Sequence, residues 1–160
     1  MQCACFWLVT HLNDGGISMT FDDSLDITAL KNALEAYRKM ITFMNKMESK
    51  PVEEIDEYEE HVIQAALSQH FKFSYELCWK FMKRFIEREG VNVGLSKRNI
   101  FRESLAMELI KDFDEWVKYT EARNETSHTY DEAVADEVAE VAKVFFPEFE
   151  RFVKTLESKL

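Results

Sequence analysis

Glycine and proline are scarce in this chain, and their positions constrain its fold more than any other feature of the sequence. Only four glycines and two prolines occur among 160 residues. No glycine lies between Gly16 and Gly90 or after Gly94. Turns between β-strands usually need glycine or proline, whereas a helix can run for many residues without either. We therefore expect an all-α protein, and the length and 46% hydrophobic content suit one well-buried domain.

Apolar residues repeated at helical spacing predict about five helices packed as an up-down bundle. The expected segments are 26–47, 52–89, 96–107, a helix that begins at 112, and a last helix that begins at a capping box over 129–132. Residues before position 26 lack this period, and a second methionine, Met19, stands just before the patterned sequence, which would also fit an over-extended start site. We expect residues 1–25 to be a disordered leader and residues 26–158 to form a single domain.

The middle of the second expected helix is apolar on nearly every side. One stripe at helical spacing comprises Phe71, Tyr75, Cys78, Met82 and Phe85. A second set occupies much of the remaining surface and comprises Phe73, Leu77, Trp79 and Phe81. One bundle core cannot cover both sets. A twofold partner is the most economical cover, so we expect a homodimer.

Charge is distributed unevenly along the chain. The formal net charge of −10 argues against broad attraction to nucleic acid or to anionic membranes. Between His70 and Arg102, however, eight basic residues outnumber three acidic ones, which gives this segment a charge of +5. It is either a local basic surface or an ordinary solvated helix face. No apolar run approaches the roughly 20 residues of a membrane span, and the three cysteines lack disulfide spacing, so we expect a cytoplasmic protein.

A stripe of helical residues changes from apolar to polar late in the chain. It begins with Phe113 and Trp116 and continues at the same spacing with Arg123, Asn124 and Ser127. Buried charges and amides cost several kcal/mol unless they are paired, so ordinary core packing does not explain these residues. A polar pocket or lined interface would explain them, and so would an internal hydrogen-bond network that fixes helix packing.

An arginine and a histidine in this region suit phosphoryl chemistry. Arg123 can bind a phosphate in a forked geometry, and His128 can exchange protons near neutral pH. The two converge only where the helix ends or bends between them. Glu125 and His128 have the spacing of half a di-iron site, but the sequence contains no second pair, no zinc spacing and no phosphate-binding glycine loop. We therefore expect no metal and no cofactor.

The segment from Arg123 to Tyr130 reads R-N-E-T-S-H-T-Y and resembles the R-x4-H-x-Y signature of HEPN-domain proteins encoded beside minimal nucleotidyltransferases. Two further blocks agree, F-K-F-S-Y-E-L-C-W-K at 71–80 and S-K-R-N-I-F-R-E-S at 96–104. Members of this family are labelled nucleotidyltransferase substrate-binding proteins, and relatives are toxins of toxin-antitoxin pairs. The resemblance implies a four-helix bundle that dimerises with the signature beside the twofold interface.

By this resemblance, Arg123 and His128 would be the catalytic pair of a metal-independent endoribonuclease, and Asn124 would help to order the site. Tyr130 would carry the hydroxyl that a partner nucleotidyltransferase adenylylates to silence the toxin. Any RNA contact would use the basic segment, in particular Lys80, Lys83, Arg84 and Arg102.

Two alternatives compete with the nuclease interpretation. The first is a non-catalytic subunit that binds a nucleotidyltransferase and helps to hold its nucleotide or substrate. The second is a purely structural dimeric bundle, which would leave the polar stripe unexplained. His70 and Lys72 stand where family members often have Arg and Glu, and this departure bears on how a partner fits.

Overall fold

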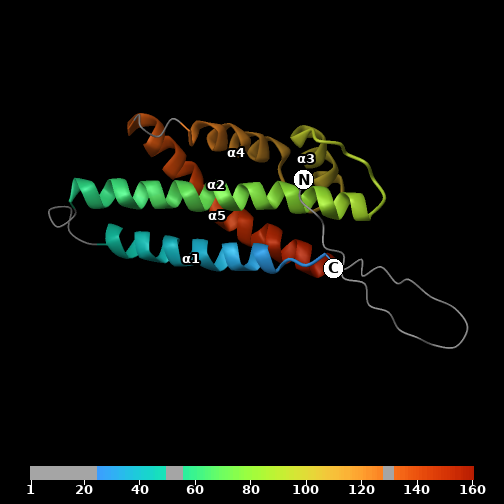
Figure 1. Ribbon diagram of the computed structural model, residues 1–160, viewed down its shortest axis with the longest axis horizontal. Coiled ribbons are helices and arrows are strands. Elements are labelled where there is room, and N and C mark those ends of the chain that lie inside the picture. Colours follow the sequence, from blue (N-terminus) through green and yellow to red (C-terminus); the bar gives the residue numbers. More distant parts are fainter. Residues whose placement is uncertain (1–24, 50–55, 128–131) are drawn as a thin grey trace, which may run out of the picture.

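The computed structural model of the chain describes residues 25–49, 56–127 and 132–160. These ranges contain five α-helices and no strand, which confirms the expected all-α fold. The helices are α1 (Thr28–Glu48), α2 (Glu57–Arg88), α3 (Lys97–Ala106), α4 (Phe113–Glu125) and α5 (Glu132–Lys159). Figure 1 shows that α1, α2, α4 and α5 run in alternating directions along the long axis of the bundle, while the short α3 lies at one end.

Side-chain caps fix the starts of three helices. Asp56 accepts a hydrogen bond from the backbone N–H of Tyr58 at 3.1 Å, so α2 begins later than expected from the sequence. Ser96 caps α3 and Asp112 caps α4, and these helices begin where the sequence predicts. A side-chain acceptor at these positions satisfies a backbone donor that the helix itself leaves unpaired.

The ends of α1 and α2 follow equally local rules. The first expected helical segment begins at Asp26, whose carboxylate accepts a hydrogen bond from the Thr28 N–H at 2.8 Å, although the helical cap position is Ile27. At the end of α2, Gly90 has a φ of 86°, a conformation that glycine adopts without steric cost. The chain therefore leaves α2 where the sequence predicts. The capping box expected at 129–132 falls largely outside the described residues.

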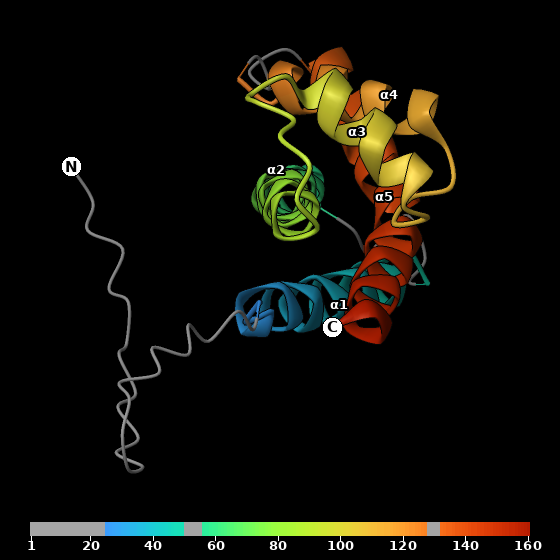
Figure 2. The same ribbon diagram turned by 90° about the vertical axis from the view of Figure 1, so that its right-hand side faces the viewer.

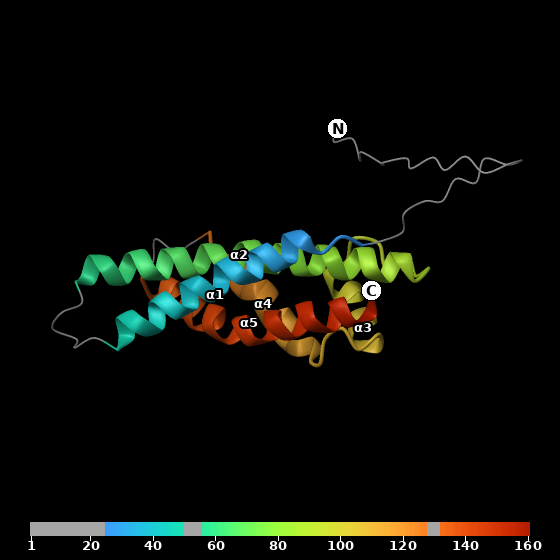
Figure 3. The same ribbon diagram turned by 90° about the horizontal axis from the view of Figure 1, so that it is seen from below.

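The long α2 is the central element of the bundle. It packs against α1, α3, α4 and α5, and α4 and α1 also pack against α5. In the end-on view of Figure 2, no described helix covers the side of α2 opposite α5. Seen from below in Figure 3, α1 crosses α2 and α5 along much of their length. Within the described ranges, none of the helices is both long and apolar enough to cross a membrane.

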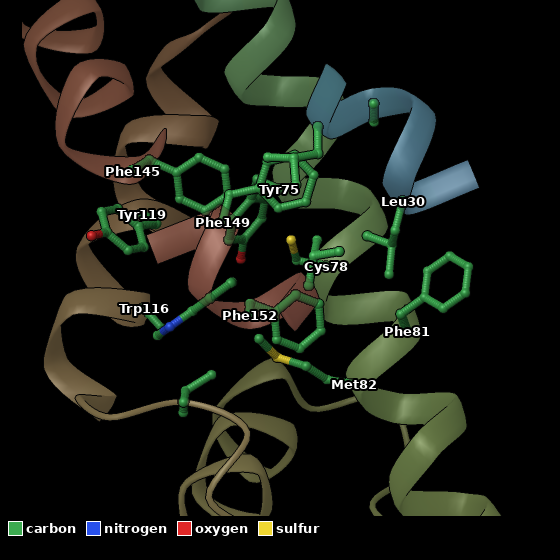
Figure 4. Packing of buried hydrophobic residues seen from close by; sticks show 14 of the residues in the cluster. Leu30, Tyr75, Cys78, Phe81, Met82, Trp116, Tyr119, Phe145, Phe149 and Phe152 are labelled. Carbon is green, nitrogen blue, oxygen red and sulfur yellow. The ribbon is translucent and has the colours of Figure 1, made fainter. Parts of the chain in front are cut away.

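Aromatic side chains form the core between α2, α4 and α5 (Figure 4). The rings of Phe145 and Phe149 are stacked with their centres 5.8 Å apart. Trp116 packs edge to face on Phe145, and the distance between these ring centres is also 5.8 Å. Tyr37 of α1 joins this core and donates a hydrogen bond from its hydroxyl to the Ala142 carbonyl at 2.8 Å. Such aromatic pairs contribute more than their buried area alone, so they fix how the helices pack.

The expected second apolar side of α2 is only partly uncovered. Phe81 is 3% exposed and belongs to the core near Leu30 of α1, so it needs no partner molecule (Figure 4). That part of the prediction was wrong, because α1 covers a wider sector of α2 than one stripe. Phe73, in contrast, is 61% exposed, while Leu77 and Trp79 are half-buried.

Candidate functional site

Arg123 lies in the last turn of α4 and contacts the middle of α2. Its Nε atom donates to Oε1 of Glu76 at 2.6 Å. The Arg123 and Glu76 side chains are 27% and 24% exposed, so the pair is partly shielded from water. This ion pair explains how the polar stripe on α4 can face another helix without leaving a buried charge unpaired.

Two further side chains contact the same carboxylate. Its Oε2 atom accepts a hydrogen bond from the indole N–H of Trp79 at 2.8 Å, and the Lys97 ammonium lies 4.0 Å from Oε1. We call Glu76, Trp79, Lys97 and Arg123 the Glu76 cluster. Its members come from α2, the first residue of α3 and the end of α4, so the site depends on the packing of three helices.

The Glu76 cluster perturbs its own titratable groups. Partial burial alone would raise the pKa of the Glu76 carboxyl, but the Trp79 hydrogen bond and the charges of Lys97 and Arg123 together lower that pKa. Partial burial lowers the pKa of Lys97, Glu76 opposes this effect, and Arg123 adds to it. The carboxylate is therefore held in its charged form, while the ammonium is less strongly favoured than on an open surface.

Aromatic rings form one wall of the Glu76 cluster. The Lys97 ammonium lies 4.9 Å from the ring centre of Tyr75 and 5.1 Å from that of Trp79. Lys80 lies on the Trp79 ring as well, at 5.8 Å. Cations are attracted to aromatic faces by the ring quadrupole. The rings thus hold Lys97 close to Glu76 and Lys80 beside Trp79 without neutralising either charge.

Hydroxyl groups continue the polar contacts between α2 and α4 toward the core. The Thr120 hydroxyl donates to the Trp116 carbonyl at 2.9 Å, and the Tyr75 hydroxyl lies 2.7 Å from the same Thr120 oxygen. Since the Thr120 proton is already used, Tyr75 acts as the donor between the two hydroxyls. The expected internal hydrogen-bond network is therefore present at this part of the stripe.

The predicted catalytic residues are only partly covered by the structure. Asn124 is exposed at the end of α4, and its backbone carbonyl accepts a hydrogen bond from the Ser127 hydroxyl at 2.9 Å. His128 and Tyr130 lie outside the described residues, so their convergence with Arg123 stays a prediction. In Figure 1, α4 ends and α5 begins at the same end of the bundle.

The four predicted RNA-binding side chains differ in their solvent exposure and in whether they pair with another side chain. Lys80, Arg84 and Arg102 are exposed, and the Arg102 guanidinium donates a hydrogen bond to the side-chain oxygen of Asn99 at 3.3 Å. Lys83 is only 22% exposed and pairs with Glu87 one turn later. Lys80 and Arg84 lie four residues apart on α2 and share a face.

The sequence interpretation missed Glu76, Trp79 and Lys97 as members of the site. A usable signal was the spacing of Glu76 and Trp79, which places both on one helix face inside a strongly basic segment. In the part of the chain that the structure describes, no group of three or more His, Cys, Asp or Glu side chains is arranged to hold a metal ion. The chemistry of the Glu76 cluster suits an anion, because its cations outnumber its one carboxylate.

These features define an up-down helical bundle with a cation-rich cluster between α2, α3 and α4. Residues 25–158 match the family described as nucleotidyltransferase substrate binding protein like. The match covers most of the chain, and the protein belongs to this family. The resemblance inferred from the three sequence blocks is confirmed.

Individual relatives agree with this assignment. The chain is 41% identical over 75 residues to a Haemophilus influenzae protein named "Probable ribonuclease HepT", and the alignment covers 44% of this chain and 51% of that protein. It thus spans about half the length of that relative. A Haemophilus influenzae structure, described as the fold of a substrate binding domain of a nucleotidyltransferase, has a TM-score of 0.71 at 28% identity.

The structural alignments cover nearly all of the compared chains. The Haemophilus influenzae structure aligns over 82% of this chain and 99% of its own. A Thermus thermophilus crystal structure has a TM-score of 0.62 at 21% identity, over 79% of this chain and 98% of its own. At that identity the second structure shows the shared fold alone.

Proposed function

We propose that this chain is the toxin of a toxin-antitoxin pair and acts as a metal-independent endoribonuclease. The observation that carries the proposal is the side-on pairing of Arg123 with Glu76 through Nε. Neither terminal amino group of Arg123 has a hydrogen-bond partner among the described residues. The guanidinium is thereby oriented, and its forked end stays available for a phosphate.

The reaction needs only groups that RNA and this chain supply. The 2′-oxygen of the ribose attacks the neighbouring phosphorus, the bond from phosphorus to the 5′-oxygen breaks, and a cyclic phosphate and a free 5′-hydroxyl result. His128 would take the 2′-hydroxyl proton, and a proton would be returned to the leaving oxygen. Arg123 would stabilise the negative charge that grows on the phosphate, and Asn124 would help to order this end of α4.

Cleavage of RNA by the purified protein in the presence of a chelator tests this proposal directly. We expect fragments that end in a cyclic phosphate, because no metal activates a water in this mechanism. The competing function is a non-catalytic subunit that binds a nucleotidyltransferase. The family description supports this function, whereas the name of the Haemophilus influenzae relative supports the nuclease. Intact RNA together with a stable complex with the nucleotidyltransferase would support that second function.

The proposal places the protein in the cytoplasm, where both RNA and a partner nucleotidyltransferase are present. Cys78 is a free thiol buried in the core, which agrees with a reducing compartment. The nuclease chemistry itself would need no cofactor.

The same proposal includes a homodimer formed through the uncovered side of α2. Phe73 is 61% exposed there and borders a groove of about 570 Å³. The groove is lined by Ala29, Asn32, Ala33, Ala36, Gln69, His70 and Phe73. Small residues along α1 allow another helix to approach closely, and an exposed aromatic ring gains most from being covered.

Sedimentation at micromolar concentration should therefore show a dimer, and Phe73→Glu should shift the protein to monomer. The matched control is Phe43→Glu, since Phe43 is a second phenylalanine that is 50% exposed but lies away from this groove. Burying a carboxylate in an apolar contact costs far more than leaving it in water. A monomeric wild-type protein would remove the support for a shared interface.

Binding of RNA should weaken steeply with salt, because cationic side chains displace counterions from phosphates. The slope of log affinity against log salt should fall when Lys80, Lys83, Arg84 and Arg102 are reversed to glutamate. The control protein carries glutamate at four exposed lysines elsewhere, which gives the same change of net charge. These are Lys31, Lys39, Lys46 and Lys154. Equal losses in both proteins would mean that net charge alone governs binding.

A further inference from the structure

Lys97 and Arg123 meet at one carboxylate oxygen although they belong to different helices. Oε1 of Glu76 is 2.6 Å from Nε of Arg123 and 4.0 Å from Nζ of Lys97. The second oxygen, Oε2, is already bound by the Trp79 indole. Glu76 is therefore fixed at both oxygens, and it holds one cation by a hydrogen bond while the other remains at longer range.

The hydrogen-bonding capacity of these two cations is largely unused. An ammonium has three donors, yet Lys97 makes no hydrogen bond to another described residue, and 4.0 Å exceeds hydrogen-bond distance. The Lys97 side chain is 29% exposed, so water reaches it less freely than on an open surface. Partly buried donors without partners favour a ligand that brings acceptor oxygens.

The charge of the Glu76 cluster is also unbalanced. Two cations, Lys97 and Arg123, lie at the single carboxylate of Glu76. A third cation, Lys80, lies over the Trp79 ring of the same cluster. A cluster that only braced the helices would be most stable with equal numbers of both charges, because each uncompensated charge is costly to shield from water. A bound monoanion would relieve part of this excess.

We propose that Lys97 and Arg123 together bind one phosphate group of a single-stranded nucleic acid. Glu76 acts as a positioning residue. It orients Arg123 through Nε and does not itself contact the phosphate. The choice of a nucleic acid rests on the proposed function, whereas the pairing of the two cations rests on the geometry of the Glu76 cluster. Lys97 thus becomes a substrate-binding residue that the sequence signature does not contain.

Fluorescence anisotropy with a labelled oligodeoxythymidine tests this proposal without any cleavage, because that strand lacks the 2′-hydroxyl nucleophile. Lys97→Met removes the charge and keeps an apolar stem on the aromatic rings. Arg98→Met is the matched control, since Arg98 is the next residue, is exposed and carries the same charge. For Lys97→Met we expect about tenfold weaker binding and a slope of log affinity against log salt concentration that is smaller in magnitude by roughly 0.7. For the Arg98→Met control we expect the affinity to change by less than about twofold.

Further variants separate binding from structural support. Lys97→Arg should restore most of the affinity, because it returns a cation to the same position. Equal losses for Lys97→Met and Arg98→Met would overturn the proposal in favour of diffuse attraction. It would also be overturned if Lys97→Met lowered the thermal midpoint while the folded protein kept wild-type affinity, since Lys97 would then be only a brace.

The two proposals can fail separately in these measurements. Binding that depends on Lys97 without any RNA cleavage would support the phosphate site and contradict the nuclease. RNA cleavage with wild-type rate and affinity in Lys97→Met would support the nuclease and contradict the phosphate site.

Discussion

Replacing His128 with alanine, or Arg123 with lysine, should lower the rate of RNA cleavage by at least about 10²-fold while the helical fold is retained. General acid–base catalysis by a histidine contributes roughly 10² to 10⁴-fold, and one donor to a developing anion contributes about 10² to 10³-fold. The measurement is single-turnover cleavage of a labelled RNA with a chelator present. Circular dichroism checks that each variant stays folded.

The structure gives a specific reason why lysine should not replace Arg123. The guanidinium uses Nε for Glu76 and still presents two amino groups to a phosphate. A lysine has one nitrogen at the end of its chain, so it can pair closely with Glu76 or approach the phosphate, but the forked contact is lost. His61→Ala is a suitable control for the histidine variant, since His61 is exposed on α2. Unaltered cleavage in either His128→Ala or Arg123→Lys would place the active site elsewhere.

Features that depend on neighbouring residues could be predicted from the sequence. Ser96 and Asp112 cap helices because a short polar side chain reaches backbone donors two or three residues later. Gly90 ends α2 because the chain needs a positive φ at that point. These effects act within one turn of helix, so they hold in any tertiary environment.

The Glu76 cluster could not be predicted in the same way. Arg123 and Glu76 are separated by 47 positions, and their contact requires a particular packing of α4 on α2. Periodicity shows which residues share a helix face, but not which faces meet or at what height along the axis. The burial of Phe81 escaped prediction for the same reason, because it depends on how far α1 extends around α2.

The polar stripe on α4 illustrates both kinds of inference. Thr120 and Arg123 lie three residues apart, and they contact the consecutive residues Tyr75 and Glu76 of α2. The contact of Thr120 is a closed hydrogen-bond network, in which each hydroxyl has a defined role. Arg123, in contrast, donates to the described residues only through Nε, so its two terminal amino groups remain without a partner among those residues. A packing contact and the side chain that we propose to bind phosphate therefore follow one another along one stripe.

A cognate nucleotidyltransferase supplied with ATP should raise the mass of the protein by one or more adenylates attached to Tyr130. In this step the phenol oxygen of Tyr130 attacks the α-phosphorus of ATP, pyrophosphate leaves, and the phenol proton passes to a base or to solvent. Tyr130 follows Arg123 by seven residues, and α4 and α5 end and begin on the same side of the bundle (Figure 1). Its position in the signature, rather than any unusual reactivity, makes it the expected acceptor.

The adenylate would silence the toxin because its phosphate competes for the same guanidinium. A phosphate beside Arg123 can take the forked contact intended for RNA, and the attached base would block access to the site. Tyr130→Phe should therefore show no mass gain, and the nucleotidyltransferase should fail to restrain it. Tyr58→Phe is the control, since Tyr58 is 72% exposed on α2 and offers an equally accessible phenol. Modification that maps to another residue, or equal restraint of Tyr130→Phe and wild type, would contradict this mechanism.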